Sequence, residues 1–183
     1  QPAIIAMPSD GLWGDGSGYV PHAVQNFEKW IGEELPALAR QTIEVVGANS
    51  PFFISGLSMG GYGAFRIGLK YPTTYQGISA HSAMTSIEQM KSMVEEDWSF
   101  WEEKQMGHIE QFIIAAHTIP SIRFDCGLED TLILPNRQLH AFLVDHHIKH
   151  QYQEFPGGHD WPYWQEKIKE TYRFFSNELN ERF

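Results

Sequence analysis

Short apolar runs alternate with longer amphipathic stretches along this chain. The runs cover residues 3–7, 52–56, 77–82, 121–126 and 151–155, and most are bounded by proline or glycine, which is typical of buried strands. Stretches with apolar side chains at helical spacing lie between most of them, over 23–42, 61–70, 136–149 and 164–179. Strands that alternate with helices predict an α/β fold with a mostly parallel sheet covered by helices on both faces.

Proline residues and one long connection modify this pattern. Pro36 predicts a kink or restart within 23–42, and Pro72 predicts the end of the helix over 61–70. Residues 83–120 form a long, Met-, Trp- and Glu-rich insertion, in which Thr85 and Glu88 have the spacing of a capping box. Insertions of this length tend to be lids or binding elements, so we expect a helical lid. Its aromatic residues either line an acyl pocket or only hold the insertion together: Trp98, Phe100 and Trp101.

The segment "FFISGLSMGGYGAF" (52–65) places a serine between glycines where a strand passes into a helix. "GLSMG" fits the pattern G-x-S-x-G of a nucleophile elbow, in which a tight turn exposes the serine, here Ser58. Large side chains at Gly56 or Gly60 are expected to clash with neighbouring backbone. The backbone N–H of Met59 is then the first donor to an oxyanion. The alternative is a glycine-rich turn with an ordinary serine.

A serine nucleophile needs a base and an acid, which follow in the order Ser, Asp or Glu, His in this architecture. "CGLEDTL" places Asp130 after the fourth predicted strand, and "FPGGHDW" places His159 after the fifth. Both lie where strands end and loops begin, the side on which open α/β sheets build their sites. Alternatively, Asp130 only stabilises the start of the next helix. Three other carboxylates are rivals for the acid: Asp125, Glu129 and Asp160.

The remaining histidines predict no metal site. His146 and His150 are four residues apart on one predicted helix, but no carboxylate or cysteine stands at a ligand spacing with them. An exposed polar face is the better interpretation. His81 ends a strand beside the insertion, where it either lines the substrate pocket or is a packed histidine with satisfied hydrogen bonds.

Composition narrows the classes of partner. The chain has 183 residues, enough for one domain, and its net charge of −10 argues against binding to nucleic acid or to anionic membranes. The one cysteine, Cys126, excludes an internal disulfide. No apolar run approaches the roughly 20 residues of a membrane helix, and no signal peptide is visible. These features favour a cytoplasmic location and leave the compartment open.

Three segments in order, "GLSMGGYGAF", "DCGLEDTL" and "PGGHDWPYW", resemble the esterase D / S-formylglutathione hydrolase-like branch of the α/β-hydrolases, as does "EELPAL" (33–38). That branch includes feruloyl esterases, acetylxylan esterases and mycolyltransferases. The resemblance implies the α/β-hydrolase fold, with Ser58 as nucleophile, Asp130 as acid and His159 as base. It also implies the N–H of Met59 as an oxyanion donor, and neither cofactor nor metal.

The resemblance also implies that sheet strands are missing. Members of the branch carry an apolar strand and a His-Gly turn upstream of the equivalent of "PAIIAMP". We therefore expect residues 1–183 to be a single, N-terminally incomplete α/β-hydrolase domain, in which strand 3–7 does not pair directly with strand 52–56. A second copy of the chain or an N-terminal segment is expected to fill that slot; the alternative is a smaller, closed sheet.

These observations predict a serine carboxylesterase that acts on a small-molecule ester through an acyl-enzyme. Aromatic side chains near the site, Trp13 and Trp161, suit a phenolic acyl group or a sugar ring, so small-acyl, carbohydrate or phenolic esters are the expected substrates. The alternatives are an S-formylglutathione-type thioesterase, an acyltransferase, or a hydrolase-fold binding protein with impaired catalysis.

Overall fold

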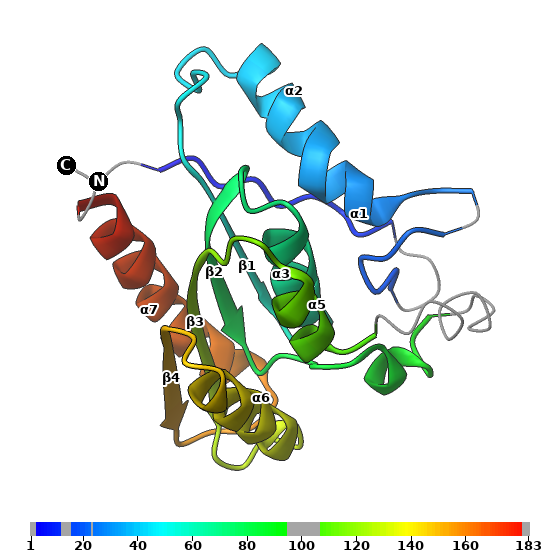
Figure 1. The fold of residues 1–183 in the computed structure, drawn as a ribbon, viewed down its shortest axis with the longest axis vertical. Helices are drawn as coiled ribbons and strands as arrows, with labels where there is room; N and C mark the ends of the chain where they lie inside the picture. Colours follow the sequence, from blue (N-terminus) through cyan, green and yellow to red (C-terminus); the bar gives the residue numbers. More distant parts are fainter. Residues whose placement is uncertain (1–2, 12–15, 23, 95–106, 181–183) are drawn as a thin grey trace.

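A computed structural model describes residues 3–11, 16–22, 24–94 and 107–180. Its centre is a four-stranded parallel sheet in the order β1-β2-β3-β4, so neighbours in sequence are also neighbours in space (Figure 1). The strands are β1 (Phe52–Leu57), β2 (Tyr75–His81), β3 (Ser121–Gly127) and β4 (His150–Phe155). The predicted α/β class is confirmed, and these strands lie within two residues of the predicted runs.

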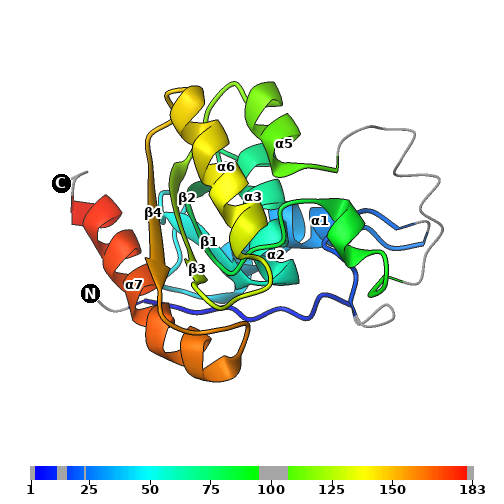
Figure 2. The same ribbon diagram turned by 90° about the horizontal axis from the view of Figure 1, so that it is seen from below.

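Helices follow each strand and cover the sheet on both faces. They are α1 (Phe27–Lys29), η1 (Trp30–Glu34), α2 (Leu35–Thr42), α3 (Met59–Lys70), η2 (Ile87–Met90), α5 (Ile109–Ala115), α6 (Ile133–Asp145) and α7 (Trp161–Asn180). Figure 2 shows α3, α5 and α6 on one side of the sheet and α7 on the other. None of the helices in the described ranges is long and apolar enough to cross a membrane.

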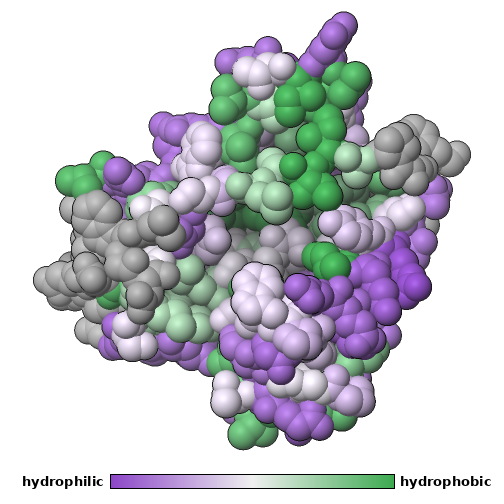
Figure 3. Space-filling model, turned by 180° about the vertical axis from the view of Figure 1, so that it is seen from behind, coloured by the Kyte–Doolittle hydropathy of each residue, from purple (hydrophilic) through white to green (hydrophobic). Residues whose placement is uncertain are grey.

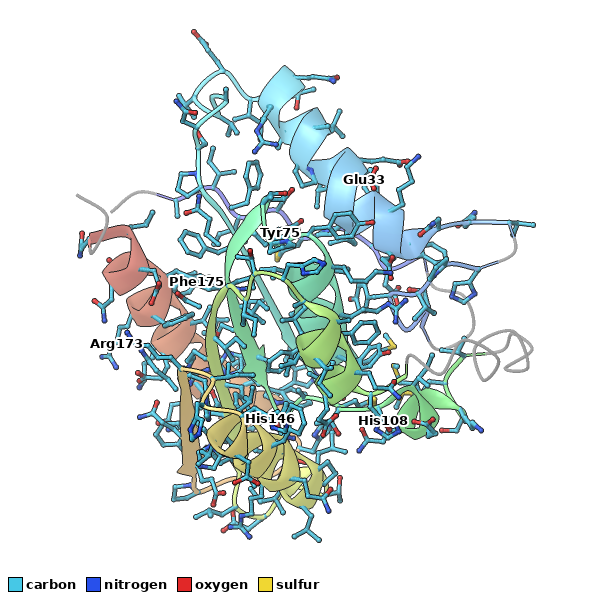
Figure 4. The ribbon with its side chains drawn as sticks, in the orientation of Figure 1. Glu33, Tyr75, His108, His146, Arg173 and Phe175 are labelled. Atoms are coloured by element: carbon cyan, nitrogen blue, oxygen red, sulfur yellow. The ribbon has the colours of Figure 1, made fainter. Side chains whose placement is uncertain are left out.

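The core lies between the sheet and α3, where Tyr62, Phe65, Ile78 and Phe124 have no exposed surface. Figure 4 shows Tyr75 at the start of β2, and its hydroxyl donates to the carbonyl of Ile31, which ties η1 to the sheet (2.6 Å). On the opposite face, Phe175 of α7 stacks on Phe53 of β1, with ring centroids 4.7 Å apart. The two faces of the sheet are therefore packed independently by α3 and by α7.

The predicted strand over 3–7 is wrong for this structure. Those residues have no regular secondary structure, and Ile4, Ile5 and Met7 are 53%, 60% and 88% exposed. Figure 3, which shows the molecule from behind, shows a group of hydrophobic residues exposed on that face. A strand needs a neighbour to accept and donate its backbone hydrogen bonds. Within the described residues, β1 pairs with β2 alone, so 3–7 is not part of the sheet and β1 forms its edge.

Two local predictions need adjustment. Pro36 does not break its helix: it lies in the first turn of α2, directly after the π-helical segment η1. In the insertion, the capping box is formed by Ser86 and Gln89 rather than by Thr85 and Glu88.

The described parts of the insertion, 83–94 and 107–120, are packed into the domain. Ile87, Met90, Ile109 and Phe112 are buried, and Ser86 forms an antiparallel bridge with His108 that joins the two parts. The lid itself stays a prediction, because Trp98, Phe100 and Trp101 lie outside the described residues.

Candidate active site

Ser58 stands at a strained turn between β1 and α3. Its φ of 52° is in the left-handed region, which a residue with a side chain adopts at a cost of about 1–3 kcal/mol. The turn is possible because Gly56 has no side chain: a Cβ there would lie 2.1 Å from the carbonyl oxygen of Gly60. At Gly60 a Cβ would make only ordinary contact with the Tyr19 side chain, whose hydroxyl lies 3.7 Å away, so a methyl group fits there.

Backbone hydrogen bonds fix this turn against the end of β2. The N–H of Ser58 donates to the carbonyl of His81 (3.0 Å), and the carbonyl of Ser58 accepts from the N–H of Met84 (3.1 Å). Helix α3 begins at Met59, so its unpaired N–H groups and positive dipole end lie beside the serine. The position of Met59 is that of a donor to a developing oxyanion.

A close approach of two loops brings the acid and base segments together. A Cβ at Gly127 would lie 2.1 Å from the carbonyl oxygen of Gly157, so a glycine is required where the loop after β3 meets the loop after β4. The Glu129 carboxylate accepts from the N–H of Gly157 (2.6 Å), and that residue's carbonyl accepts from the N–H of Glu129 (3.1 Å). Glu129 thus braces the loop that carries His159.

The structure brings Ser58, His159 and Asp130 into one hydrogen-bonded relay. Nε2 of His159 lies 2.9 Å from Oγ of Ser58, and Nδ1 lies 2.9 Å from Oδ2 of Asp130. An ionised carboxylate only accepts hydrogen bonds, so the proton of the neutral imidazole is on Nδ1. Nε2 therefore carries the lone pair and is ready to accept the proton of Ser58.

The carboxylate of Asp130 is fully buried, whereas 28% of the His159 side chain is exposed. Burial by itself raises the pKa of Asp130, but hydrogen bonds from His159, Ser82 and the N–H of Leu132 outweigh it and hold that pKa below its usual value. Asp130 therefore stays ionised beside the imidazole. Its bond to the N–H of Leu132 (2.8 Å) shows that it also orders the turn before α6.

The rival carboxylates have other partners. Glu129 bonds to Gly157, as above, and Asp160 accepts from the N–H of Tyr163 in the first turn of α7 (2.9 Å). Asp125 is fully buried and accepts from the Tyr163 hydroxyl (2.6 Å). Of the four candidates, the carboxylate at His159 is that of Asp130.

His81 does not line a pocket, which decides between its two interpretations. Its side chain is 3% exposed; Nδ1 lies 2.8 Å from Asp125, and Nε2 lies 2.8 Å from the hydroxyl of Thr171. Arg123 pairs with the same carboxylate. Burial raises the pKa of Asp125, but contacts with His81, Arg123 and Tyr163 outweigh this and lower it. His81 is thus part of a buried ionic cluster beneath the site.

Of the aromatic residues predicted to line the substrate pocket, only some lie in the described part of the chain. Trp161 begins α7 and is 64% exposed, with its ring edge-on to Trp164 at 5.4 Å. Trp164, in the first turn of α7, lies edge-on to the His159 ring at 4.8 Å. The pocket candidates Trp13 and Trp98 lie outside the described residues.

The other candidate reactive side chains do not belong to the Ser58–His159–Asp130 relay. His146 and His150 do not share a helix as expected, because α6 ends at Asp145 and His150 begins β4. A surface groove of about 580 Å³ lies between α6 and β4, lined by His140 and His150 among others, and no relay residue borders it. The described side chains form no group of three metal-ligating residues. Burial and Asp130 raise the pKa of Cys126 to about 12, so this thiol stays protonated.

Comparison with known protein families shows to which family the chain belongs. The Esterase family model matches residues 15–175, which is most of the chain. The chain belongs to the Esterase family. An acetyl esterase from Caldicellulosiruptor saccharolyticus is 29% identical over 170 residues, which are 82% of this chain and 64% of that protein. The chain thus spans a little under two thirds of the length of this relative.

Solved structures give the same fold. A ferulic acid esterase superimposes with a TM-score of 0.72 at 22% identity, covering 88% of this chain and 65% of that one. The S-formylglutathione hydrolase of Staphylococcus aureus gives a TM-score of 0.66 at 24% identity, covering 77% and 57%. The α/β-hydrolase fold and the resemblance to this branch are therefore confirmed for this Esterase-family chain.

Proposed function

We propose that this Esterase-family chain carries the catalytic machinery of a serine carboxylesterase. The relay from Ser58 through His159 to Asp130, with both links at 2.9 Å on a strained elbow, is the observation that carries the proposal. A serine bonded to a neutral imidazole, itself oriented by a buried carboxylate, is the arrangement that activates a hydroxyl for attack on a carbonyl.

In the proposed reaction, Oγ of Ser58 attacks the ester carbonyl carbon while Nε2 of His159 takes the hydroxyl proton. Asp130 stabilises the resulting imidazolium through Nδ1, and the N–H of Met59 donates to the oxyanion at the start of α3. The tetrahedral intermediate collapses when His159 returns the proton to the leaving alcohol. Water then attacks the acyl-enzyme by the same steps in reverse and releases the acid.

Esters with a small or phenolic acyl group, or with a sugar as the alcohol, are the substrates we favour. The 29% identical relative bears the name acetyl esterase, and a structural neighbour bears the name ferulic acid esterase. The exposed ring of Trp161, edge-on to Trp164 next to His159, offers an apolar surface on which a sugar or phenol ring can stack.

Hydrolysis of p-nitrophenyl acetate tests the proposal. We expect turnover by the parent chain and a loss of on the order of 10⁴- to 10⁶-fold in kcat for Ser58→Ala. Ser50→Ala is the matched control and should keep parental activity, because it removes a half-buried hydroxyl in the loop before β1 that accepts from the N–H of Gly47 (2.9 Å). Parent turnover that survives unchanged in Ser58→Ala would refute the mechanism.

The same relay would also cleave a thioester or pass the acyl group to another alcohol, and substrate competition separates these alternatives. An esterase should prefer the oxygen ester over the matching thioester in kcat/KM. An acyltransferase should give more transacylation product than free acid when a sugar alcohol is added. A binding protein with impaired catalysis should bind the ester without turnover.

A further inference from the structure

The side chain of Tyr163 joins the loop that carries His159 to the buried ionic cluster beneath the site. Tyr163 lies in the first turn of α7 and is 4% exposed. Its hydroxyl donates to Oδ1 of Asp125 (2.6 Å), whose side chain has no exposed surface. Burial and the neighbouring carboxylate raise the pKa of Tyr163, so its hydroxyl stays protonated and remains the donor of this bond.

Tyr163 contacts the histidine loop on both sides of His159. Before the histidine, its ring lies against the backbone of Gly157, where an added Cβ would be 2.6 Å from Cδ2 of the ring. Gly157 has a φ of 131°, which a residue with a side chain adopts only under strain. After the histidine, the N–H of Tyr163 donates to Oδ1 of Asp160 (2.9 Å). His159 therefore lies between two residues that Tyr163 holds.

Asp125 is a fixed attachment point for the Tyr163 hydroxyl. It lies on β3, which is paired with β2 on one side and with β4 on the other. Its Oδ2 lies 2.8 Å from Nδ1 of His81 and is ion-paired with the guanidinium of Arg123, so Oδ1 remains for the tyrosine. A hydrogen bond to a buried charged group is stronger than one between neutral groups. The phenol ring is thereby fixed relative to the sheet.

We infer that Tyr163 is a positioning residue for His159: its hydroxyl, bonded to Asp125, holds the histidine loop so that the imidazole stays within reach of the nucleophile. This inference rests on the proposed function, because positioning matters only if the relay performs catalysis. Tyr163 acts through the backbone of the loop and not on the substrate. Both links of the relay are 2.9 Å long, and a displacement of about 1 Å can cost on the order of 100-fold in rate.

Tyr163→Phe is the informative variant, because it removes the hydroxyl and keeps the ring against Gly157. We expect kcat for p-nitrophenyl acetate to fall about 10- to 100-fold, with KM within about threefold of the parent, because the change affects proton transfer rather than binding. Proton NMR gives a readout independent of turnover. The downfield resonance of Nδ1–H in His159, which reports its bond to Asp130, should weaken or broaden in Tyr163→Phe.

Tyr75→Phe is the matched control. Tyr75 is also 4% exposed, and its hydroxyl also donates over 2.6 Å, but to the carbonyl of Ile31. It begins β2, whereas the last residue of that strand is bonded to Ser58. The loss of a buried hydroxyl should lower the urea midpoint of both variants. Under conditions in which circular dichroism shows both variants folded, the fall in kcat and the change in the NMR resonance should appear in Tyr163→Phe alone.

If Tyr163→Phe does not fold, Gly157→Ala tests the same connection from the loop side, because its methyl group would press on the Tyr163 ring without touching the buried carboxylate. It should lower kcat by at least about tenfold. Parental kcat in folded Tyr163→Phe or in Gly157→Ala, or an equal loss of kcat in Tyr75→Phe, would overturn the inference. The proposed function would still stand if Ser58→Ala is inactive. Parental turnover in Ser58→Ala would instead refute the proposed function itself.

Discussion

Gly56→Ala should damage stability and activity together, because the elbow has no room for a methyl group. The added Cβ would lie 2.1 Å from the carbonyl oxygen of Gly60 and 2.3 Å from its carbonyl carbon. Ordinary contacts begin at 3.4 Å, so the two backbone segments must separate by more than an ångström. Both are held by regular structure, Gly56 by β1 and Gly60 by the first turn of α3, so neither can move alone.

The expected cost is about 2–4 kcal/mol, at or above the usual range for overpacking, because the obstacle is backbone rather than a flexible side chain. With a denaturant slope of about 2 kcal/mol per molar urea, the unfolding midpoint should fall by about 1–2 M. The shift also tilts the start of α3 away from Ser58, so kcat should fall by at least tenfold in the fraction that remains folded.

Gly60→Ala is the matched control, four residues along the same motif. Its Cβ would meet only the Tyr19 side chain, at 3.7 Å or more, and alanine is favoured over glycine in a helix by up to about 1 kcal/mol. Urea unfolding followed by circular dichroism and p-nitrophenyl acetate hydrolysis compare the two variants. A Gly56→Ala chain with the midpoint and kcat of Gly60→Ala would refute the steric reasoning.

Three further predictions concern the acid, the buried cluster and the sheet edge. Asp130→Asn should lower kcat by roughly 10⁴-fold, because the amide favours the wrong imidazole tautomer, whereas Glu129→Gln should stay within about tenfold; the reverse order in ester hydrolysis would mean that the acid is misassigned. Asp125→Asn should cost about 3–5 kcal/mol at pH 7 in urea unfolding, since it leaves Arg123 buried without its counter-charge. Burial raises the pKa of Asp125, but His81 and Arg123 outweigh it and lower that pKa. The contribution of Asp125 to the free energy of unfolding is therefore present above about pH 5 and lost as the pH falls. A difference in unfolding free energy between parent and Asp125→Asn that widens toward about pH 3 would contradict this. Among the described residues β1 has a strand on one side only, which predicts self-association or capture of another strand, and a single 21.0 kDa monomer in light scattering would show that this edge needs no partner.

The sequence was sufficient for the elements whose patterns are local. The strand runs, the helical stripes and the G-x-S-x-G turn each report their own backbone, so β1 to β4 and α3 lie close to where they were expected. The order of Asp130 and His159 after successive strands brought them to one end of the sheet, because parallel strands all end on that side.

The predictions that failed depend on contacts with residues far away in the sequence, which no local pattern indicates. Residues 3–7 have a strand-like composition, but a strand exists only where a neighbour pairs with it. His81 was a pocket candidate because strand ends meet the site, yet Asp125 on the adjacent strand draws it into the interior (2.8 Å).

Covalent labelling of Ser58 tests the central claim most directly. A fluorophosphonate reacts with a serine only when a neighbouring base activates the hydroxyl, so it reports the relay without requiring the natural substrate. We predict one adduct per chain by intact mass, located on Ser58 by peptide mapping, absent in Ser58→Ala and strongly slowed in His159→Ala. Labelling at another serine, or none on Ser58 in folded chain that hydrolyses esters, would contradict the account.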